Sequence, residues 1–129
     1  MTTVFPSAYF PSIGYLQAYF SHQDRRIEVY ESFPKQTYRN RCVISTSRGK
    51  LRLSLPLKKP QGSKTMTKDV LLDGSAAWQK EHWRSIRTAY AAAPYFEQYD
   101  KEIHQLIHTK HSHLIDLNFE ILEFIHEVV

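Results

Sequence analysis

The clearest hydrophobic pattern in this chain has a period of two residues. Leucines alternate with mainly polar residues over Leu51–Leu57, and the β-prone run Cys42–Ser45 precedes them. Between the two runs, Ser47–Lys50 supplies the residue types that turns favour. The pattern predicts a β-hairpin over Tyr38–Leu57.

Weaker patterns precede the hairpin. Val4–Phe10 is short and apolar and predicts a strand, although Pro6 interrupts it. A turn rich in proline, serine and glycine follows, and Tyr15–Phe20 then predicts a short helix. Arg26–Ser32 alternates apolar and polar residues, as expected of a second strand.

After the hairpin the pattern becomes mainly helical. A brief apolar strand is expected at Val70–Leu72, followed by a helix for which Ser75 is a suitable N-cap. Pro94 should end or restart that helix, because the residue before a proline avoids the α conformation. We expect a second helix from about Tyr95 and a third from about Ser112.

These elements predict an α/β fold, with α+β as the alternative, in a single domain over residues 1–129. The expected architecture is a small mixed sheet that includes the central hairpin, followed by about three C-terminal helices. The last helix runs to Val128–Val129 with no glycine, no basic last turn and no polar tail. That ending predicts either a truncated chain or a C-terminus that packs against a partner.

Composition narrows the class of protein. Hydrophobic residues make up 42% and charged residues 23% of the chain, which is near the average of globular domains and argues against general disorder. Cys42 is the only cysteine, so no internal disulfide can form, as expected in the cytoplasm. No stretch approaches the roughly 20 apolar residues of a membrane helix. We therefore expect a soluble, cytoplasmic protein with no membrane insertion.

Charge is distributed unevenly along the chain. Lys35–Lys68 contains ten lysines or arginines and no acidic residue, whereas Glu97–Val129 contains seven acidic residues and only two lysines. One part of the fold should therefore attract anions. This segment is either a solvated basic face or the binding site of a ligand that carries phosphate.

The basic residues are densest in Lys35–Arg41. In an extended strand Arg39 and Arg41 point to the same face and Asn40 to the other. Two guanidinium groups on one face could bind a phosphate or carboxylate through paired hydrogen bonds. The alternative is an edge strand whose charges protect it from pairing. We favour an anion site at Lys35, Arg39 and Arg41.

The aromatic segment 78–99 contains one candidate for proton transfer. His82 lies four residues after Trp78, so the two share a helical face, and Trp83 is adjacent. A histidine there could act as a general base or donate a hydrogen bond to a ligand. The alternative is a core histidine whose hydrogen bonds stay within the protein. Trp83 also forms an apolar stripe with Ile86 and Tyr90, and no nucleophile motif accompanies the histidine.

A stripe of Asp100, His104, His108 and His111 has helical spacing. Imidazoles one turn apart can bind a divalent ion, but a metal site usually also takes a ligand from another element. We therefore interpret this stripe as a solvated face and predict no metal site. The sequence identifies no cofactor.

Basic residues interleaved with aromatic ones also suggest binding to single-stranded nucleic acid. No aromatic signature of an RNA-binding fold is present, and the acidic C-terminal helices would oppose a wide footprint. Nucleic acid is therefore not the expected partner.

Three stretches carry a resemblance when they are taken in order. Tyr9–Tyr15 is similar to a Gln-Pro-x-Tyr-Leu-Pro signature that Gly-Tyr follows. Asn40–Arg41 is followed by the alternating segment Leu51–Leu57, and the aromatic segment Trp78–Tyr99 completes the series. Together they resemble the WbqC-like family over nearly the whole chain. The chain departs from the signature at Pro6–Ser7, where the Gln-Pro pair would fall.

The resemblance implies a role in the synthesis of O-antigen lipopolysaccharide and other bacterial surface polysaccharides, in which sugars are carried on nucleotide diphosphates. It leaves the reaction open between a transferase that acts on a nucleotide-activated or phosphorylated sugar and a non-catalytic module that docks a glycosyltransferase. For an enzyme we expect Lys35, Arg39 and Arg41 to hold phosphate, and Asn40 and Tyr9 to orient the ligand. Trp78 and Trp83 would form an aromatic wall, and His82 would transfer the proton.

Overall fold

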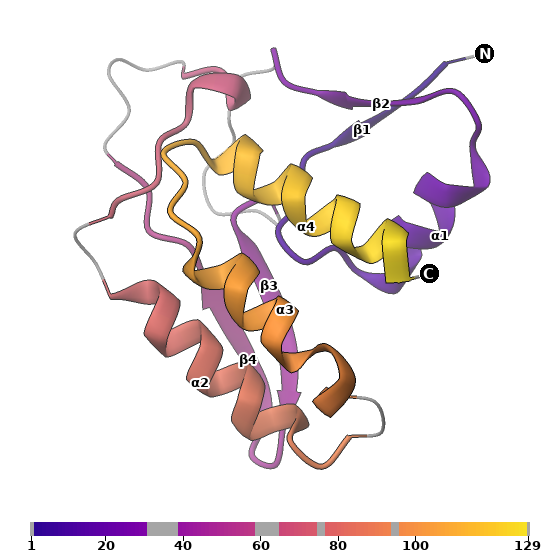
Figure 1. Ribbon diagram of the computed structural model, residues 1–129. Helices are drawn as coiled ribbons and strands as arrows, with labels where there is room; N and C mark the ends of the chain where they lie inside the picture. The colour runs from indigo at the N-terminus through magenta and orange to yellow at the C-terminus, as the bar shows by residue number, and fades with distance from the viewer. Residues whose placement is uncertain (1, 31–38, 59–64, 75–76, 94–95, 129) are drawn as a thin grey trace.

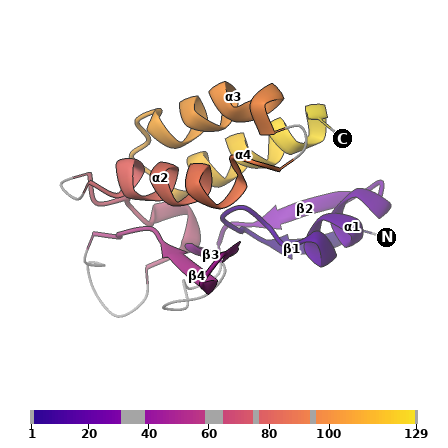
Figure 2. The same ribbon diagram turned by 90° about the horizontal axis from the view of Figure 1, so that it is seen from below.

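The computed structural model describes residues 2–30, 39–58, 65–74, 77–93 and 96–128. Figures 1 and 2 show that helices α2, α3 and α4 lie on one side of the molecule and the β3–β4 hairpin on the other. The expected α/β class, with its helices mostly C-terminal, is confirmed. In chain order the elements are β1 (Thr3–Pro6), α1 (Ile13–Ser21), β2 (Arg25–Glu28), β3 (Arg41–Thr46), β4 (Gly49–Ser54), a 3-10 turn (Thr67–Asp69), α2 (Trp78–Tyr90), α3 (Phe96–His108) and α4 (Leu114–Val128).

The strands pair in two separate ladders. β1 and β2 are parallel, and α1 connects them. The side chain of Ser12 caps α1 by accepting a hydrogen bond from the backbone N–H of Tyr15 at 3.2 Å, as serine commonly does at this position. The first strand was expected to reach Phe10 but ends at Pro6, because a proline has no N–H with which to continue a ladder. The second ends at Glu28, and residues 31 and 32 of its predicted span lie outside the described residues.

The predicted hairpin is confirmed. β3 and β4 are antiparallel, with partners running from Arg41 and Ser54 to Thr46 and Gly49, so Ser47 and Arg48 form a two-residue loop. Gly49 has φ +113°, a backbone conformation that a side chain would strain.

The three C-terminal helices also occur where the pattern predicts them. α2 begins at Trp78, with Ala77 at its N-cap position; the predicted cap, Ser75, lies outside the described residues. The break expected at Pro94 falls between α2 and α3, although that residue is itself outside the described part. No strand forms at Val70–Leu72, where only isolated bridges to His113 and Leu57 occur.

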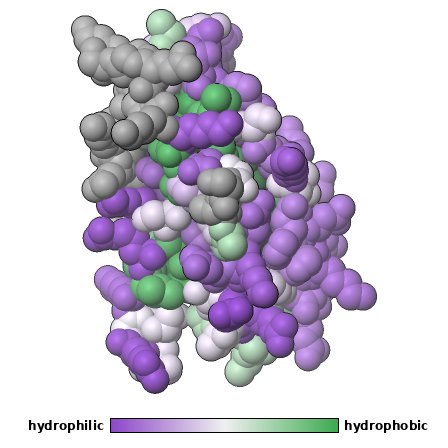
Figure 3. All heavy atoms as spheres, turned by 90° about the vertical axis from the view of Figure 1, so that its left-hand side faces the viewer, coloured by the Kyte–Doolittle hydropathy of each residue, from purple (hydrophilic) through white to green (hydrophobic). Residues whose placement is uncertain are grey.

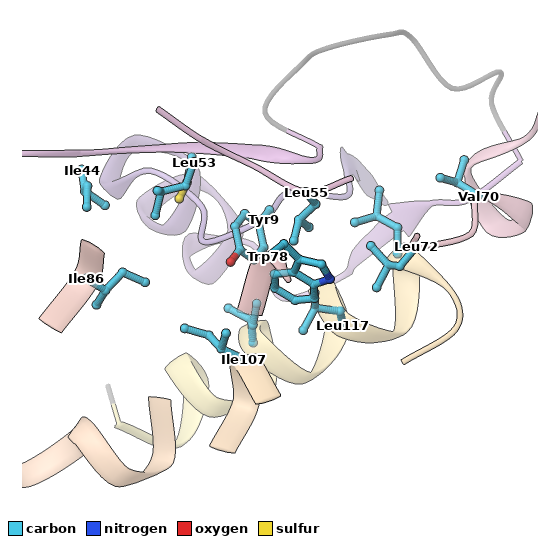
Figure 4. Close-up of a cluster of buried hydrophobic side chains, with 13 residues drawn as sticks. Tyr9, Ile44, Leu53, Leu55, Val70, Leu72, Trp78, Ile86, Ile107 and Leu117 are labelled. Atoms are coloured by element: carbon cyan, nitrogen blue, oxygen red, sulfur yellow. The ribbon is translucent and has the colours of Figure 1, made fainter. Parts of the chain in front are cut away.

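The core lies between the helices and the hairpin. Figure 4 shows Trp78 among Leu55, Leu72 and Leu117, with Ile107 from α3 close by. α1 contributes no buried residue to this core. The face shown in Figure 3 is mostly hydrophilic, with hydrophobic side chains exposed only in small areas. No described helix is long and apolar enough to cross a membrane.

Candidate functional site

A buried hydrogen-bonded chain joins three distant segments. The hydroxyl of Tyr9 contacts Nδ1 of His82 at 2.9 Å, and Nε2 of the same ring contacts the backbone carbonyl oxygen of Ser54 at 3.1 Å. Tyr9 is 1% exposed and His82 is 4% exposed. Phe10 follows with φ +41°, an uncommon conformation for a residue other than glycine. The Phe10 side chain nevertheless packs against the core beside Tyr9, with ring centroids 5.0 Å apart.

The contacts determine the protonation of His82. A carbonyl oxygen can only accept, so Nε2 must carry the hydrogen that it donates to Ser54. In the neutral ring Nδ1 is then an acceptor, and the Tyr9 hydroxyl donates to it. Burial lowers the pKa of His82, although the Ser54 carbonyl and the Glu81 carboxylate oppose that shift. Burial also raises the pKa of Tyr9 well above its usual value, with a smaller contribution from Cys42. Both groups are therefore neutral near pH 7.

A second buried polar cluster lies where α4 meets the start of the hairpin. The side-chain amide of Asn118 donates to the hydroxyl oxygen of Ser7 at 2.7 Å and to the backbone carbonyl of Arg39 at 2.9 Å. Asn40 donates from its side chain to the Leu55 carbonyl at 3.3 Å. The cluster thus connects the N-terminal segment, the hairpin and the last helix.

Three buried polar atoms, on Asn118 and on the residues that lead into β3, lack a hydrogen-bond partner among the described residues. They are Oδ1 of Asn40, Oδ1 of Asn118 and Nε of Arg41. The two asparagines are 6% and 4% exposed. Buried polar atoms without partners are rare because each costs about 1–3 kcal/mol. Two acceptors, on Asn40 and Asn118, and one cationic donor, on Arg41, are therefore available to a ligand or to water.

A small cavity borders the same cluster. Its volume is about 10 Å³, and its lining residues include Ser7, Pro11, Tyr15 and Asn118. That volume is close to the minimum for one water molecule. A larger ligand at this junction would therefore need side chains to move.

The basic cluster is only partly described. Lys35 and Tyr38 lie outside the described residues. Arg39 and Asn40 form a turn, and β3 begins at Arg41. The alternation of an extended strand therefore does not extend to Arg39, and the argument that placed both arginines on one face does not apply. Both are half-buried, and the Asn118 bond fixes the Arg39 backbone beside the cluster.

The two tryptophans have different environments. Trp78 is 5% exposed and shares the buried face of α2 with His82 and Ile86. Trp83 is half-buried, and its ring stacks on Phe96 at a centroid distance of 6.2 Å. The face of α2 that carries Trp78 and His82, which was considered for a ligand, is therefore buried. Trp83 is the tryptophan closer to solvent.

The histidine stripe lies on α3 and just beyond it. His104 and His108 are exposed and their rings stack at 4.0 Å, while Nε2 of His111 lies 3.0 Å from a carboxylate oxygen of Glu120 on α4. Within the described ranges, no group of three or more histidine, cysteine, aspartate or glutamate side chains is arranged to hold a metal ion.

The sequence did not single out Ser7 or Asn118 as site residues. Asn118 lies on an otherwise apolar face of α4, between Leu117 and Ile121, and both neighbours are completely buried. A polar residue on a buried helical stripe is the signal that could have identified it, because it needs hydrogen-bond partners there. Ser7 has no comparable signal and is recognised only through its contact with α4.

Comparison with known proteins identifies a family. No curated protein and no solved structure matches the chain. The model of the WbqC-like protein family matches residues 7–129, a range that includes Ser7, Tyr9, Asn40, His82 and Asn118. The earlier resemblance is therefore confirmed, and this chain belongs to the WbqC-like protein family.

Proposed function

We propose that this protein binds a nucleotide-activated or otherwise phosphorylated sugar at the junction of Ser7, Asn40, Arg41 and Asn118. The observation that supports the proposal is that buried polar atoms of Asn40, Arg41 and Asn118 have no hydrogen-bond partner among the described residues. Sugar hydroxyls donate hydrogen bonds, and phosphate oxygens accept them from guanidinium groups. Acceptor oxygens on two asparagines and a donor on a guanidinium group therefore complement a sugar that carries phosphate.

Each residue has a separate role in this proposal. Arg41 binds a phosphate oxygen through Nε, and Arg39 adds positive charge at the mouth of the site. We also assign Lys35 to phosphate binding, and this assignment rests on the sequence alone. Asn40 and Asn118 orient the sugar through their Oδ1 atoms, while Trp83, as the less buried tryptophan, is the better candidate for an aromatic wall than Trp78.

His82 takes part through Tyr9. Both ring nitrogens of His82 contact protein groups, so proton exchange with a ligand would pass through the Tyr9 hydroxyl. These contacts support a positioning role for His82, in which it holds the Tyr9 side chain against the hairpin and α2. Tyr9 in turn orients the ligand from the buried side of the site.

The wider function that we propose is a transferase reaction in bacterial surface polysaccharide synthesis, such as that of O-antigen lipopolysaccharide, in the cytoplasm. Membership of the WbqC-like family supports the choice of pathway. The excess of basic residues between Lys35 and Lys68 supports an anionic substrate.

A thermal-shift experiment tests the proposal. A panel of UDP- and dTDP-sugars is added to the protein, and a sugar present at 100 times its Kd should raise Tm by about 10 °C. Arg41→Ala should abolish that shift, whereas Arg87→Ala, which removes an exposed arginine of α2, should retain it. The absence of any shift across the panel would overturn the proposal.

A second candidate is a non-catalytic module that docks a glycosyltransferase. Among the described residues no strand pairs with the outer edge of β3, and such an edge favours interaction with a protein segment. Co-purification with a glycosyltransferase, together with full function in an Arg41→Ala, His82→Ala double variant, would support this candidate over the first.

A further inference from the structure

One edge of the hairpin presents unpaired backbone groups. The N–H of Leu55 donates to the carbonyl of Asn40 at 2.8 Å, and these positions continue the β3–β4 register. Hydrogen-bonded and non-hydrogen-bonded pairs alternate along an antiparallel ladder. The backbone N–H and C=O groups of the odd-numbered residues of β3 therefore point away from β4. These residues are Arg41, Val43 and Ser45.

A contact at one end of the edge supports this assignment. The backbone N–H of Ser45 points towards α2 and lies 3.5 Å from the hydroxyl oxygen of Tyr90. Val43, the middle residue of the edge, is 44% exposed. Within the described ranges, no strand pairs with β3 on this side. Such an edge is a template for a further strand.

An apolar groove lies along the same edge. Its volume is about 430 Å³, which is within the usual range for binding pockets. Cys42 and Ile44 of β3 form one wall, Ile86 and Tyr90 of α2 form a second, and Phe96 of α3 lies in a third. Figure 2 shows α2 and α3 on the same side of the hairpin, with α2 nearer to it. The groove would accept the apolar side chains of one face of an added strand.

The outer face of the hairpin is basic. Cross-strand pairing places Val43 opposite Arg52 and Ser45 opposite Lys50, and Arg41 lies on the same face. All of these side chains are exposed or half-buried. Opposite charges on neighbouring strands stabilise their pairing, and like charges destabilise it. Acidic side chains are therefore favoured on the outer face of a strand added to β3.

We propose that the β3 edge binds an extended segment of a partner protein in which acidic and apolar residues alternate. The segment adds a third strand to the hairpin. Its backbone pairs with the outward groups of Arg41 and Val43, its apolar residues enter the groove, and its acidic residues lie beside Arg41 and Arg52. This mode of recognition gives affinity through the main chain and specificity through alternate side chains.

The charges also distinguish this partner from a second copy of the chain. Pairing two β3 edges would join two basic outer faces, because the hairpin contains arginine and lysine but no acidic residue on that face. Like charges on adjacent strands oppose that arrangement. An acidic segment neutralises the face instead.

Amide NMR tests the proposal directly. The probe is a blocked seven-residue peptide in which glutamate alternates with valine, and its control replaces every glutamate with lysine. We expect the amide signals of Val43 and its neighbours to shift and the Val43 amide to exchange at least tenfold more slowly, with no such change at Arg52. The affinity should fall as salt is added.

Paired proline variants separate edge pairing from charge. Val43→Pro removes an outward N–H without removing a bond to β4, and should weaken binding about fivefold or more. Arg52→Pro removes an outward N–H on the opposite edge, that of β4. It should bind the peptide with the same affinity as Arg52→Gln, which loses only the charge. Circular dichroism checks that each variant folds; if Val43→Pro does not, the exchange of the wild-type amides decides.

Several results would overturn the inference. These are no binding at a peptide concentration on the order of 1 mM, equal binding of the lysine peptide, or shifts that map to β4. If sedimentation shows a dimer that Val43→Pro abolishes, the partner of the β3 edge is a second copy of the chain and not an acidic segment.

Discussion

Replacing Tyr9 with phenylalanine should destabilise the protein by about 2 kcal/mol. The substitution keeps the ring in the core and removes only the hydroxyl that donates to Nδ1 of His82 at 2.9 Å. Because His82 is 4% exposed, water cannot readily replace the lost donor. A buried acceptor left without a partner costs about 1–3 kcal/mol, which sets the estimate.

The chain offers a matched control for this substitution. Tyr15 also donates its hydroxyl, to the backbone carbonyl of Pro6 at 2.6 Å, but this contact is exposed to solvent. Water can satisfy that carbonyl after Tyr15→Phe, so the expected cost is about 0.5 kcal/mol or less. Urea unfolding at pH 7.5 measures both free energies of unfolding, provided that the slope of each transition is unchanged.

Equal costs for the two variants would refute the reasoning. A further check is to repeat Tyr9→Phe in a His82→Leu background, where Nδ1 is absent. The cost of Tyr9→Phe should then fall by about 1 kcal/mol or more, because residues in contact are coupled. An unchanged cost would show that the hydroxyl acts through some other contact.

Three further predictions concern stability. The free energy of unfolding should fall as the pH falls below about 6.5, because burial lowers the pKa of His82 in the folded protein and the unfolded state then binds the proton more tightly. The fall should level off below the folded pKa of His82. His82→Gln should weaken this pH dependence, as measured by urea titrations between pH 8 and 5. Asn118→Leu should cost about 1–3 kcal/mol because the Ser7 hydroxyl stays buried without its partner, and an unchanged Tm would contradict this. Ile107→Ala should cost about 2–5 kcal/mol since Ile107 is completely buried, whereas Ile13→Ala, at a position that is 75% exposed, should change the unfolding free energy by about 0.5 kcal/mol or less.

Local pattern was a good guide to the secondary structure of this chain. The hairpin and the three later helices could be predicted because alternation and helical spacing report on residues that are close in sequence. Val70–Leu72 failed as a strand because three apolar residues carry too short a pattern to specify pairing. Their bridges to Leu57 and His113 depend on distant segments.

The candidate site was less accessible to the same reasoning. Extended alternation placed Arg39 and Arg41 on one face, but a turn at Arg39 precedes β3. Helical spacing grouped Trp78 with His82 correctly, yet it could not say that this face is the most buried on α2. Periodicity identifies which residues share a face, whereas the depth of that face depends on what packs against it.

The sequence by itself determined the family, the class of fold, the hairpin, the helices and the concentration of basic residues before and within the hairpin. Only the tertiary structure decided that Tyr9 and His82 meet across 73 positions and that Asn118 reaches Ser7 across 111. It also decided that an apolar groove lies along the β3 edge of the hairpin. Contacts of this kind join segments whose separation leaves no periodic trace in the chain. They form because each buried polar group must find a partner in the packed core, wherever in the sequence that partner lies.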